Sequence, residues 1–157
     1  MASLLGRSGT CPTWHAKAKT LIIGYGNPLR EDDGIGWRAA ELLDGRVDAE
    51  IVYTQQLAPE LAAQLATTSF VIFLDASLEQ EPGGVQCQTL QPEDPSGWSH
   101  HLSPGQLLEL TRQLSGASPR AFLITGGARQ MNLGDELTAE GERAAQRMAT
   151  AAISLTN

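Results

Sequence analysis

The sequence has few cysteines, few basic residues and no long apolar run, and each shortage excludes a class of protein. Cys11 and Cys87 are the only cysteines among 157 residues, and they lie too far apart for a paired-thiolate metal motif. Two separate cysteines without a secretory signal indicate free thiols in a reducing compartment, so we expect a cytoplasmic protein. No apolar run reaches the about 18 to 20 residues that span a bilayer, which argues against a transmembrane protein.

Positive charge is also scarce. The chain has 11 Lys and Arg against 18 Asp and Glu, a net charge of -7, and its basic residues form no cluster. Nucleic acids and anionic membrane surfaces are bound by clustered basic residues. The composition therefore predicts neither a nucleic-acid partner nor a membrane partner.

The chain is expected to form one domain after a short N-terminal tail. Residues 1–19 contain no continuous apolar segment of the kind found in signal peptides, and we expect them to be poorly ordered. From Thr20 onward, strand and helix patterns alternate without an internal repeat or a linker. Residues 20–157 therefore form the predicted domain.

Alternating patterns predict a mostly parallel sheet. Short apolar or alternating segments predict five strands, at residues 20–24, 49–54, 69–76, 84–90 and 120–125. Apolar residues at helical spacing predict four helices, which begin near Asp33, Leu57, Ser103 and Thr138. The order βαβαββαβα predicts a single three-layer α/β/α domain, with a mostly parallel five-stranded sheet and helices on both faces. In such sheets, functional residues gather beyond the carboxyl ends of the strands.

The start of the third helix is the most clearly marked. Ser103 is expected as its N-cap, with Pro104 in the first turn and Gln106 completing a capping box. Leu107, Leu110 and Leu114 are expected to form its apolar face.

Carboxylates follow the first and third predicted strands. Asp32 and Asp33 stand where the first helix begins, and Asp75 ends the apolar segment VIFLD. A helix N-terminus needs only one side-chain cap, so the second acidic residue is left to be explained. Asp75 is expected at the carboxyl edge of the sheet, where it either bonds the following backbone or points into the crevice.

Two histidines precede the third helix. His100 and His101 lie in a loop after the fourth predicted strand, where an isolated histidine is more often solvated or locally hydrogen-bonded than a ligand. The loops after the first, third and fourth strands are expected to meet at one crevice. Two carboxylates and one imidazole would suit a divalent transition metal held only in part by this protein. A structural zinc site would need four ligands, usually including thiolates, and the chain cannot supply them.

Two other kinds of chemistry fit the residues poorly. The glycines after the first strand stand where dinucleotide-binding proteins carry their fingerprint, but Leu29 replaces the third glycine and Pro28 lacks an N–H donor. No Gly-x-Ser-x-Gly motif is present, and Cys87 is expected to be a small core side chain inside a strand. The residues therefore predict metal-dependent chemistry or none.

Three motifs resemble those of the nickel-hydrogenase maturation endopeptidases. Residues 23–36 (IGYGNPLREDDGIG) match a strand, Gly-x-Gly-Asn-x-Leu and two acidic residues near Gly-x-Gly. Residues 73–76 (FLDA), followed by Pro82 and Gly83, match a second block, and residues 100–103 (HHLS) match a His-x-Leu-Ser block. The resemblance runs from Thr20 to about Leu155.

The resemblance implies a specific reaction. These endopeptidases trim a C-terminal extension from the hydrogenase large subunit after nickel has been inserted. Their ligand set carries over to Asp33, Asp75 and His100, which would act as both the catalytic and the metal-binding residues. The nickel would be supplied by the substrate, and no tightly bound metal of the protein's own is expected.

One departure from the family's pattern bears on the choice of substrate. Residues 54–57 (TQQL) stand where many members have an Asp-Gly-Gly-Thr-like stretch. This variant is similar to the group that serves bidirectional, NAD-linked hydrogenases. Two alternatives stay open: a free-standing metallohydrolase with its own divalent metal, and a non-enzymatic chaperone for nickel or the large subunit.

Overall fold

The computed structural model describes residues 19–94 and 101–157. Five strands form one sheet in the order β2-β1-β3-β5-β4. Four of them run parallel: β1 (Thr20–Tyr25), β2 (Glu50–Thr54), β3 (Phe70–Ser77) and β5 (Arg120–Gly127). The fifth, β4 (Val85–Leu90), pairs antiparallel with β5 at one edge. The predicted fold, a mostly parallel five-stranded sheet, is confirmed.

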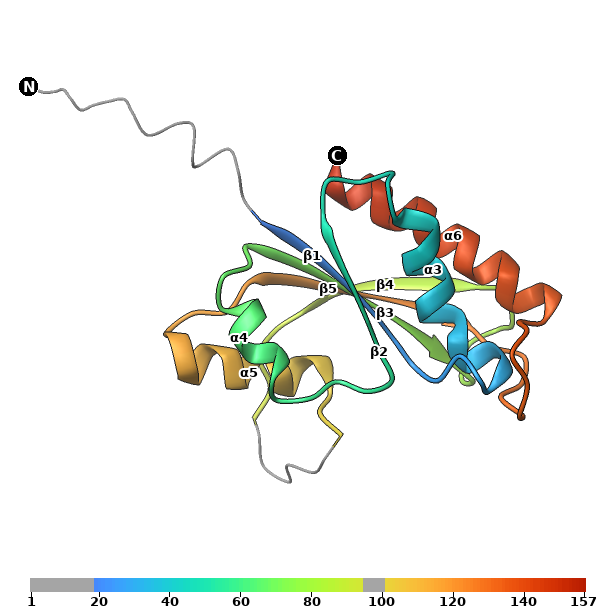
Figure 1. Cartoon of the computed structure of the whole chain (residues 1–157), viewed down its shortest axis with the longest axis horizontal. Helices are drawn as coiled ribbons and strands as arrows, with labels where there is room; N and C mark the ends of the chain where they lie inside the picture. The colour runs from blue at the N-terminus through green and yellow to red at the C-terminus, as the bar shows by residue number, and fades with distance from the viewer. Residues whose placement is uncertain (1–18, 95–100) are drawn as a thin grey trace, which may run out of the picture.

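Helices cover both faces of this sheet (Figure 1). One face carries α3 (Ile35–Leu43), which follows a short 3-10 helix η1 (Glu31–Gly34), together with α6 (Ala139–Thr156). The other face carries α4 (Leu61–Leu65) and α5 (Pro104–Ser115). No helix in the described ranges is long and apolar enough to cross a membrane.

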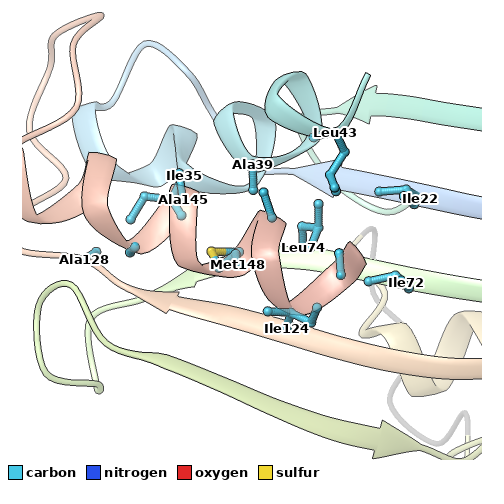
Figure 2. Close-up of a cluster of buried hydrophobic side chains, with 14 residues drawn as sticks. Ile22, Ile35, Ala39, Leu43, Ile72, Leu74, Ile124, Ala128, Ala145 and Met148 are labelled. Atoms are coloured by element: carbon cyan, nitrogen blue, oxygen red, sulfur yellow. The ribbon is translucent and has the colours of Figure 1, made fainter. Parts of the chain in front are cut away.

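The central strands bury both of their faces, because successive side chains of a strand point to opposite sides. Ile22 and Ile72 pack with Met148 of α6 in the core under α3 and α6 (Figure 2). Leu21 and Phe73 pack against α4 and α5 on the other side. The sheet is thereby buried between two apolar layers, one under α3 and α6 and one under α4 and α5.

The predicted start of α5 is confirmed, but its predicted apolar face is only partly right. Ser103 Oγ accepts from Gln106 N at 3.1 Å, and Gln106 Oε1 accepts from Ser103 N at 2.9 Å, which completes the capping box. Leu107 is buried together with Leu108, whereas Leu114 is 69% exposed. The last turn of the helix is exposed throughout, so it extends beyond the core.

Two further expectations about strands are wrong. Cys87 is exposed on β4, because β4 lies at the edge of the sheet and is less covered than the central strands. The fifth strand does not stop at Thr125 but continues through Gly126 and Gly127. A Cβ at Gly126 would lie 2.5 Å from the sulfur of Met148, so the glycine allows α6 to pack closely against the strand.

Candidate functional site

The segment between β1 and α3 carries three consecutive acidic residues, and the structure gives each a different role. Asp32 is fully buried. Its carboxylate accepts from Arg129 N at 2.8 Å, from Thr138 N at 2.8 Å and from Thr138 Oγ1 at 2.6 Å. Asp32 therefore fastens η1 to the loop between β5 and α6.

Glu31 has a similar fastening role. Its carboxylate accepts from Gln130 Nε2 at 2.8 Å and from Asn132 N at 3.1 Å. Its backbone N–H donates to the carbonyl of Gly134 at 2.8 Å, and its φ of 47° lies in the left-handed region. The contacts with the β5–α6 loop hold this unfavourable backbone conformation in place.

Asp33, unlike Glu31 and Asp32, makes no side-chain hydrogen bond to the β5–α6 loop as far as the structure describes that loop, and it lies near the edge of the sheet. It is half-buried, and its Oδ2 accepts from Asn27 N at 3.0 Å. The residue before α3 is Gly34, and no side chain caps that helix. The expectation that Asp32 or Asp33 caps the helix is therefore wrong, because both carboxylates bond backbone outside it.

Glycines in the same segment bring α3 up to the ends of two strands. Gly26 has a φ of +134°, and a Cβ there would collide with the carbonyl oxygen of Asp33. A Cβ at Gly36 would collide with the carbonyl oxygen of Leu74 and lie 2.8 Å from that of Tyr25. The glycine pattern thus serves close packing of helix on sheet, which places Asp33 over the ends of β1 and β3.

Asp75 lies near the carboxyl end of β3, two residues before its last residue, and the charge of Asp33 acts on it. Its Oδ1 accepts from Ala76 N at 2.8 Å, and the hydroxyl of Tyr25 donates to its carboxylate. Burial raises the pKa of Asp75 to about 6; the two hydrogen bonds lower this pKa, and the nearby charge of Asp33 raises it. The role of bonding the following backbone, one of the two alternatives that the sequence offered for Asp75, is therefore confirmed.

Tyr25 is a residue of this site that sequence reasoning missed. Gly24 pairs with Leu74 across β1 and β3, so Tyr25 and Asp75 are the next two neighbours. The ring of Tyr25 meets that of Phe73 edge-on, at 6.5 Å between centroids. Burial, and then the charge and hydrogen bond of Asp75, raise the pKa of the Tyr25 hydroxyl, which therefore stays a donor at neutral pH. Strand alternation puts Tyr25 on the face of Ile23, but only the strand pairing puts it beside Asp75.

The two described members of the predicted ligand set are thus brought together, and the third is not placed. His100 lies outside the described residues. Because β4 is antiparallel, with Leu90 opposite Ala121, the chain leaves β4 at the amino edge of the parallel strands. The loop after β4 therefore does not start at the carboxyl edge, as the expected convergence of loops required, and the position of His100 stays a prediction. Within residues 19–94 and 101–157, no group of three metal-ligating side chains occurs.

The pair has a clear electrostatic character. In the described part of the chain, no ion pair involves Asp33 or Asp75. Two partly buried carboxylates, one of which acts electrostatically on the other, attract a cation that can approach from outside. Two oxygen ligands leave the remaining coordination positions of such a cation open.

Comparison with known proteins places this fold. No protein-family model matches the sequence, and no curated protein matches it either. Among solved structures, it is similar to the NiFe hydrogenase maturation protease HybD from Thermococcus kodakarensis, with a TM-score of 0.71 and 22% identity over 88% of this chain and 99% of that one.

Two other structures agree with that likeness. The hydrogenase maturating endopeptidase HybD from E. coli gives a TM-score of 0.69 and 21% identity over 87% of this chain and 91% of that one. The hydrogenase 2 maturation peptidase from Thaumarchaeota archaeon SCGC_AB-539-E09 gives a TM-score of 0.63 and 25% identity over 87% and 97%. The chain has the fold of the hydrogenase maturation proteases, in agreement with the resemblance of its motifs.

Proposed function

We propose that the chain is an endopeptidase that removes the C-terminal extension of a nickel-loaded hydrogenase large subunit precursor. The observation that supports the proposal is the charge of Asp33 acting on Asp75, near the carboxyl edge of a sheet that has the fold of hydrogenase maturation proteases. Both residues stand in the motifs that carry the family resemblance. Such an edge is where α/β proteins place their functional groups.

Nickel in the substrate would be recognised through the unmet charge of this pair. The ionised form of Asp75 is disfavoured by burial and by the charge of Asp33. A divalent cation bound between the two carboxylates would offset both effects, whereas a precursor without nickel offers nothing to compensate them. His100 is proposed as the third ligand. Binding would then depend directly on whether the precursor has received its metal.

The same arrangement would support hydrolysis. A metal that is held by substrate thiolates and by protein oxygens polarises a nearby peptide carbonyl or activates a bound water. One of the two carboxylates would take the proton from that water, and the proton would pass to the leaving amine as the peptide bond breaks. Asp33, Asp75 and His100 are thus proposed as the catalytic residues, and the protein needs no metal of its own.

The segment after β2 is proposed to contribute to the choice of substrate. The carbonyl of Thr54 accepts from Trp37 Nε1 at 2.9 Å and from Gly26 N at 3.1 Å, so this segment is tied to the loop that carries Asp33. We propose that its sequence, TQQL, suits the large subunit of a bidirectional, NAD-linked hydrogenase.

Incubation with purified precursor tests the function. The protein is mixed with nickel-loaded and with nickel-free precursor, and the mass of the large subunit is measured. We expect loss of the extension only from the nickel-loaded form. A precursor that is bound but keeps its length would favour the chaperone. Stoichiometric zinc that survives dialysis against a mild chelator, together with cleavage of nickel-free precursor, would favour the metallohydrolase.

A further inference from the structure

A pocket lies on the flank of the molecule, between α3 and the edge strand β2. It has a volume of about 400 Å³ and is lined by Trp37, Glu41, Asp44 and Tyr53. The first three follow one another at helical spacing along one side of α3 and its C-terminal end, and Tyr53 comes from β2. Because β2 is the outermost strand, no further strand of the described sheet covers Tyr53.

Two aromatic rings form the walls of this pocket. The ring centroids of Trp37 and Tyr53 are 5.5 Å apart, and the ring planes are inclined at 53° to each other. The bond from Trp37 Nε1 to the carbonyl of Thr54 fixes the orientation of the indole. A cationic group within about 6 Å of such a ring face is attracted to its π electrons, and tryptophan attracts it most strongly.

The remaining walls are negative. The charges of Asp44 and Glu41 add to burial in raising the pKa of Tyr53, so both carboxylates lie near its ring. They stand at the C-terminal end of α3, where the helix backbone itself has negative character. Three negative contributions and two aromatic rings therefore point to one kind of ligand, a cation.

The arginine side chains nearby do not supply the cation that the pocket would bind. Arg38 lies 3.9 Å from Glu41 but makes its shorter bonds, from 3.0 Å, to Glu142 of α6. Arg46 reaches the carbonyl of Leu42 at 3.5 Å. In the described part of the chain, Asp44 forms no ion pair. The stretch from residue 41 to residue 50 has four acidic residues and one basic residue: Glu41, Asp44, Asp48 and Glu50 against Arg46.

We infer that the pocket of Trp37, Glu41, Asp44 and Tyr53 binds a lysine or arginine side chain of the precursor protein. The inference rests on the proposed function, which makes a polypeptide the substrate. Tyr53 directly precedes Thr54, whose carbonyl accepts from Gly26 N, and Gly26 packs against Asp33. The pocket is thus connected through β2 to the loop that carries Asp33, and the same precursor chain would place its nickel at the carboxylate pair and a basic side chain in this pocket.

Steady-state cleavage of nickel-loaded precursor tests this inference. The variants are the double substitution Glu41→Gln/Asp44→Asn and the single substitution Tyr53→Leu. For each we expect KM to rise roughly tenfold with kcat unchanged, because a contact remote from the scissile bond contributes binding alone. For the double variant, the dependence of KM on salt concentration should also weaken.

A charge-matched control separates the pocket from general electrostatic attraction. Asp48→Asn/Glu60→Gln removes the same charge from exposed positions outside the pocket, and its KM should stay near that of the wild type. An equal rise in KM for both double variants would overturn the inference that the pocket binds a basic side chain. A wild-type KM in both pocket variants, with cleavage still proceeding, would overturn it too. If the wild type does not cleave the precursor at all, the proposed function falls, and the inference falls with it. Melting temperatures within a few degrees of the wild type confirm that each variant is folded.

Discussion

Two carboxylates near the carboxyl edge of the sheet, the fully buried Asp32 and the partly buried Asp75, differ in what surrounds them. Asp32 receives three hydrogen bonds, all from Arg129 and Thr138. Asp75 receives one from Ala76 and one from Tyr25, and it also feels the charge of Asp33. The hydrogen bonds within the protein compensate the burial of the Asp32 carboxylate. The Asp75 carboxylate has fewer such bonds and can still accept a further ligand.

The difference in hydrogen bonding distinguishes a carboxylate that stabilises the fold, Asp32, from one that is available to a ligand, Asp75. Burying an ionised carboxylate is unfavourable unless hydrogen bonds or opposite charges compensate for the lost water. The contacts of Asp32 provide that compensation and join two distant segments. At Asp75 the compensation is incomplete, as its pKa of about 6 shows, and a cation brought by a substrate would complete it.

The largest expected effect is the loss of stability in Asp32→Ala. The substitution leaves the N–H groups of Arg129 and Thr138 without their acceptor and removes three of the hydrogen bonds that join η1 to the β5–α6 loop. We expect the free energy of unfolding to fall by about 3 kcal/mol or more, as when one partner of a buried charged network is removed. Urea unfolding at pH 7.5 measures this loss of free energy of unfolding. Asp32→Asn, which keeps one acceptor oxygen, should lose less, and a loss below about 1 kcal/mol in Asp32→Ala would contradict the fastening role.

The sequence alone could not show that Asp32, and not Asp33, is the carboxylate that fastens η1 to the β5–α6 loop. The partners of Asp32 lie 97 and 106 positions further along the chain, and no local pattern announces them. The capping box of α5, by contrast, involves residues three positions apart, and it was predicted correctly. Local chemistry is visible in sequence, whereas the partners of a buried carboxylate depend on the assembled fold.

Strand order explains the other differences between prediction and structure. The alternating pattern of residues 84–90 indicates a strand but does not tell that β4 lies at an edge and runs antiparallel. Both facts matter, because they expose Cys87 and make the chain leave β4 at the amino edge of the parallel strands. The fold class and the closeness of Asp33 to Asp75 were nevertheless predictable, because parallel strands place their carboxyl ends together.

Asp75→Asn is expected to stabilise the protein at neutral pH. The folded-state pKa of Asp75 is about 6 against an ordinary value of 3.8. The folded protein therefore binds this proton more tightly than the unfolded chain, and its stability falls as the pH rises from about 4 through 6. Removing the charge should add about 2 to 3 kcal/mol at pH 7.5 and nothing below pH 3.5. Urea unfolding at both pH values tests this, and precursor cleavage should be abolished. If Asp75→Asn were less stable than the wild type at pH 7.5, the claim that the charge of Asp75 is less well compensated than that of Asp32 would be wrong.

Tyr25→Phe should have a smaller effect of opposite sign. It removes the hydroxyl that donates to the Asp75 carboxylate but keeps the ring that packs against Phe73. We expect a loss of about 1.5 kcal/mol at pH 7.5, within the range for a hydrogen bond to a charged group. A double-mutant cycle with Asp75→Asn measures the coupling by urea unfolding. Additive effects of the two substitutions would show that the hydroxyl does not act through Asp75.

The smallest effect on stability is expected for His100→Ala, which tests the remaining member of the proposed ligand set. The sequence predicts a loop position for His100, and a polar residue at such a position should contribute little to the free energy of unfolding, within about 0.5 kcal/mol. Cleavage of nickel-loaded precursor should nevertheless be abolished, because one of three ligands to the metal is lost. Mass spectrometry of the precursor and a thermal melt of the variant measure the two effects separately.

His101→Ala is the matched control, because His101 is the exposed neighbour that the motif places beside the site and not in it. It should cleave normally. If His101→Ala stops cleavage and His100→Ala does not, the ligand assignment is shifted by one residue. Normal cleavage by both variants would contradict recognition of nickel through a histidine in this loop, and would leave Asp33 and Asp75 as the whole protein contribution to the metal. Loss in both variants would be assigned by the thermal melt, since a collapsed loop lowers the melting temperature and a missing ligand does not.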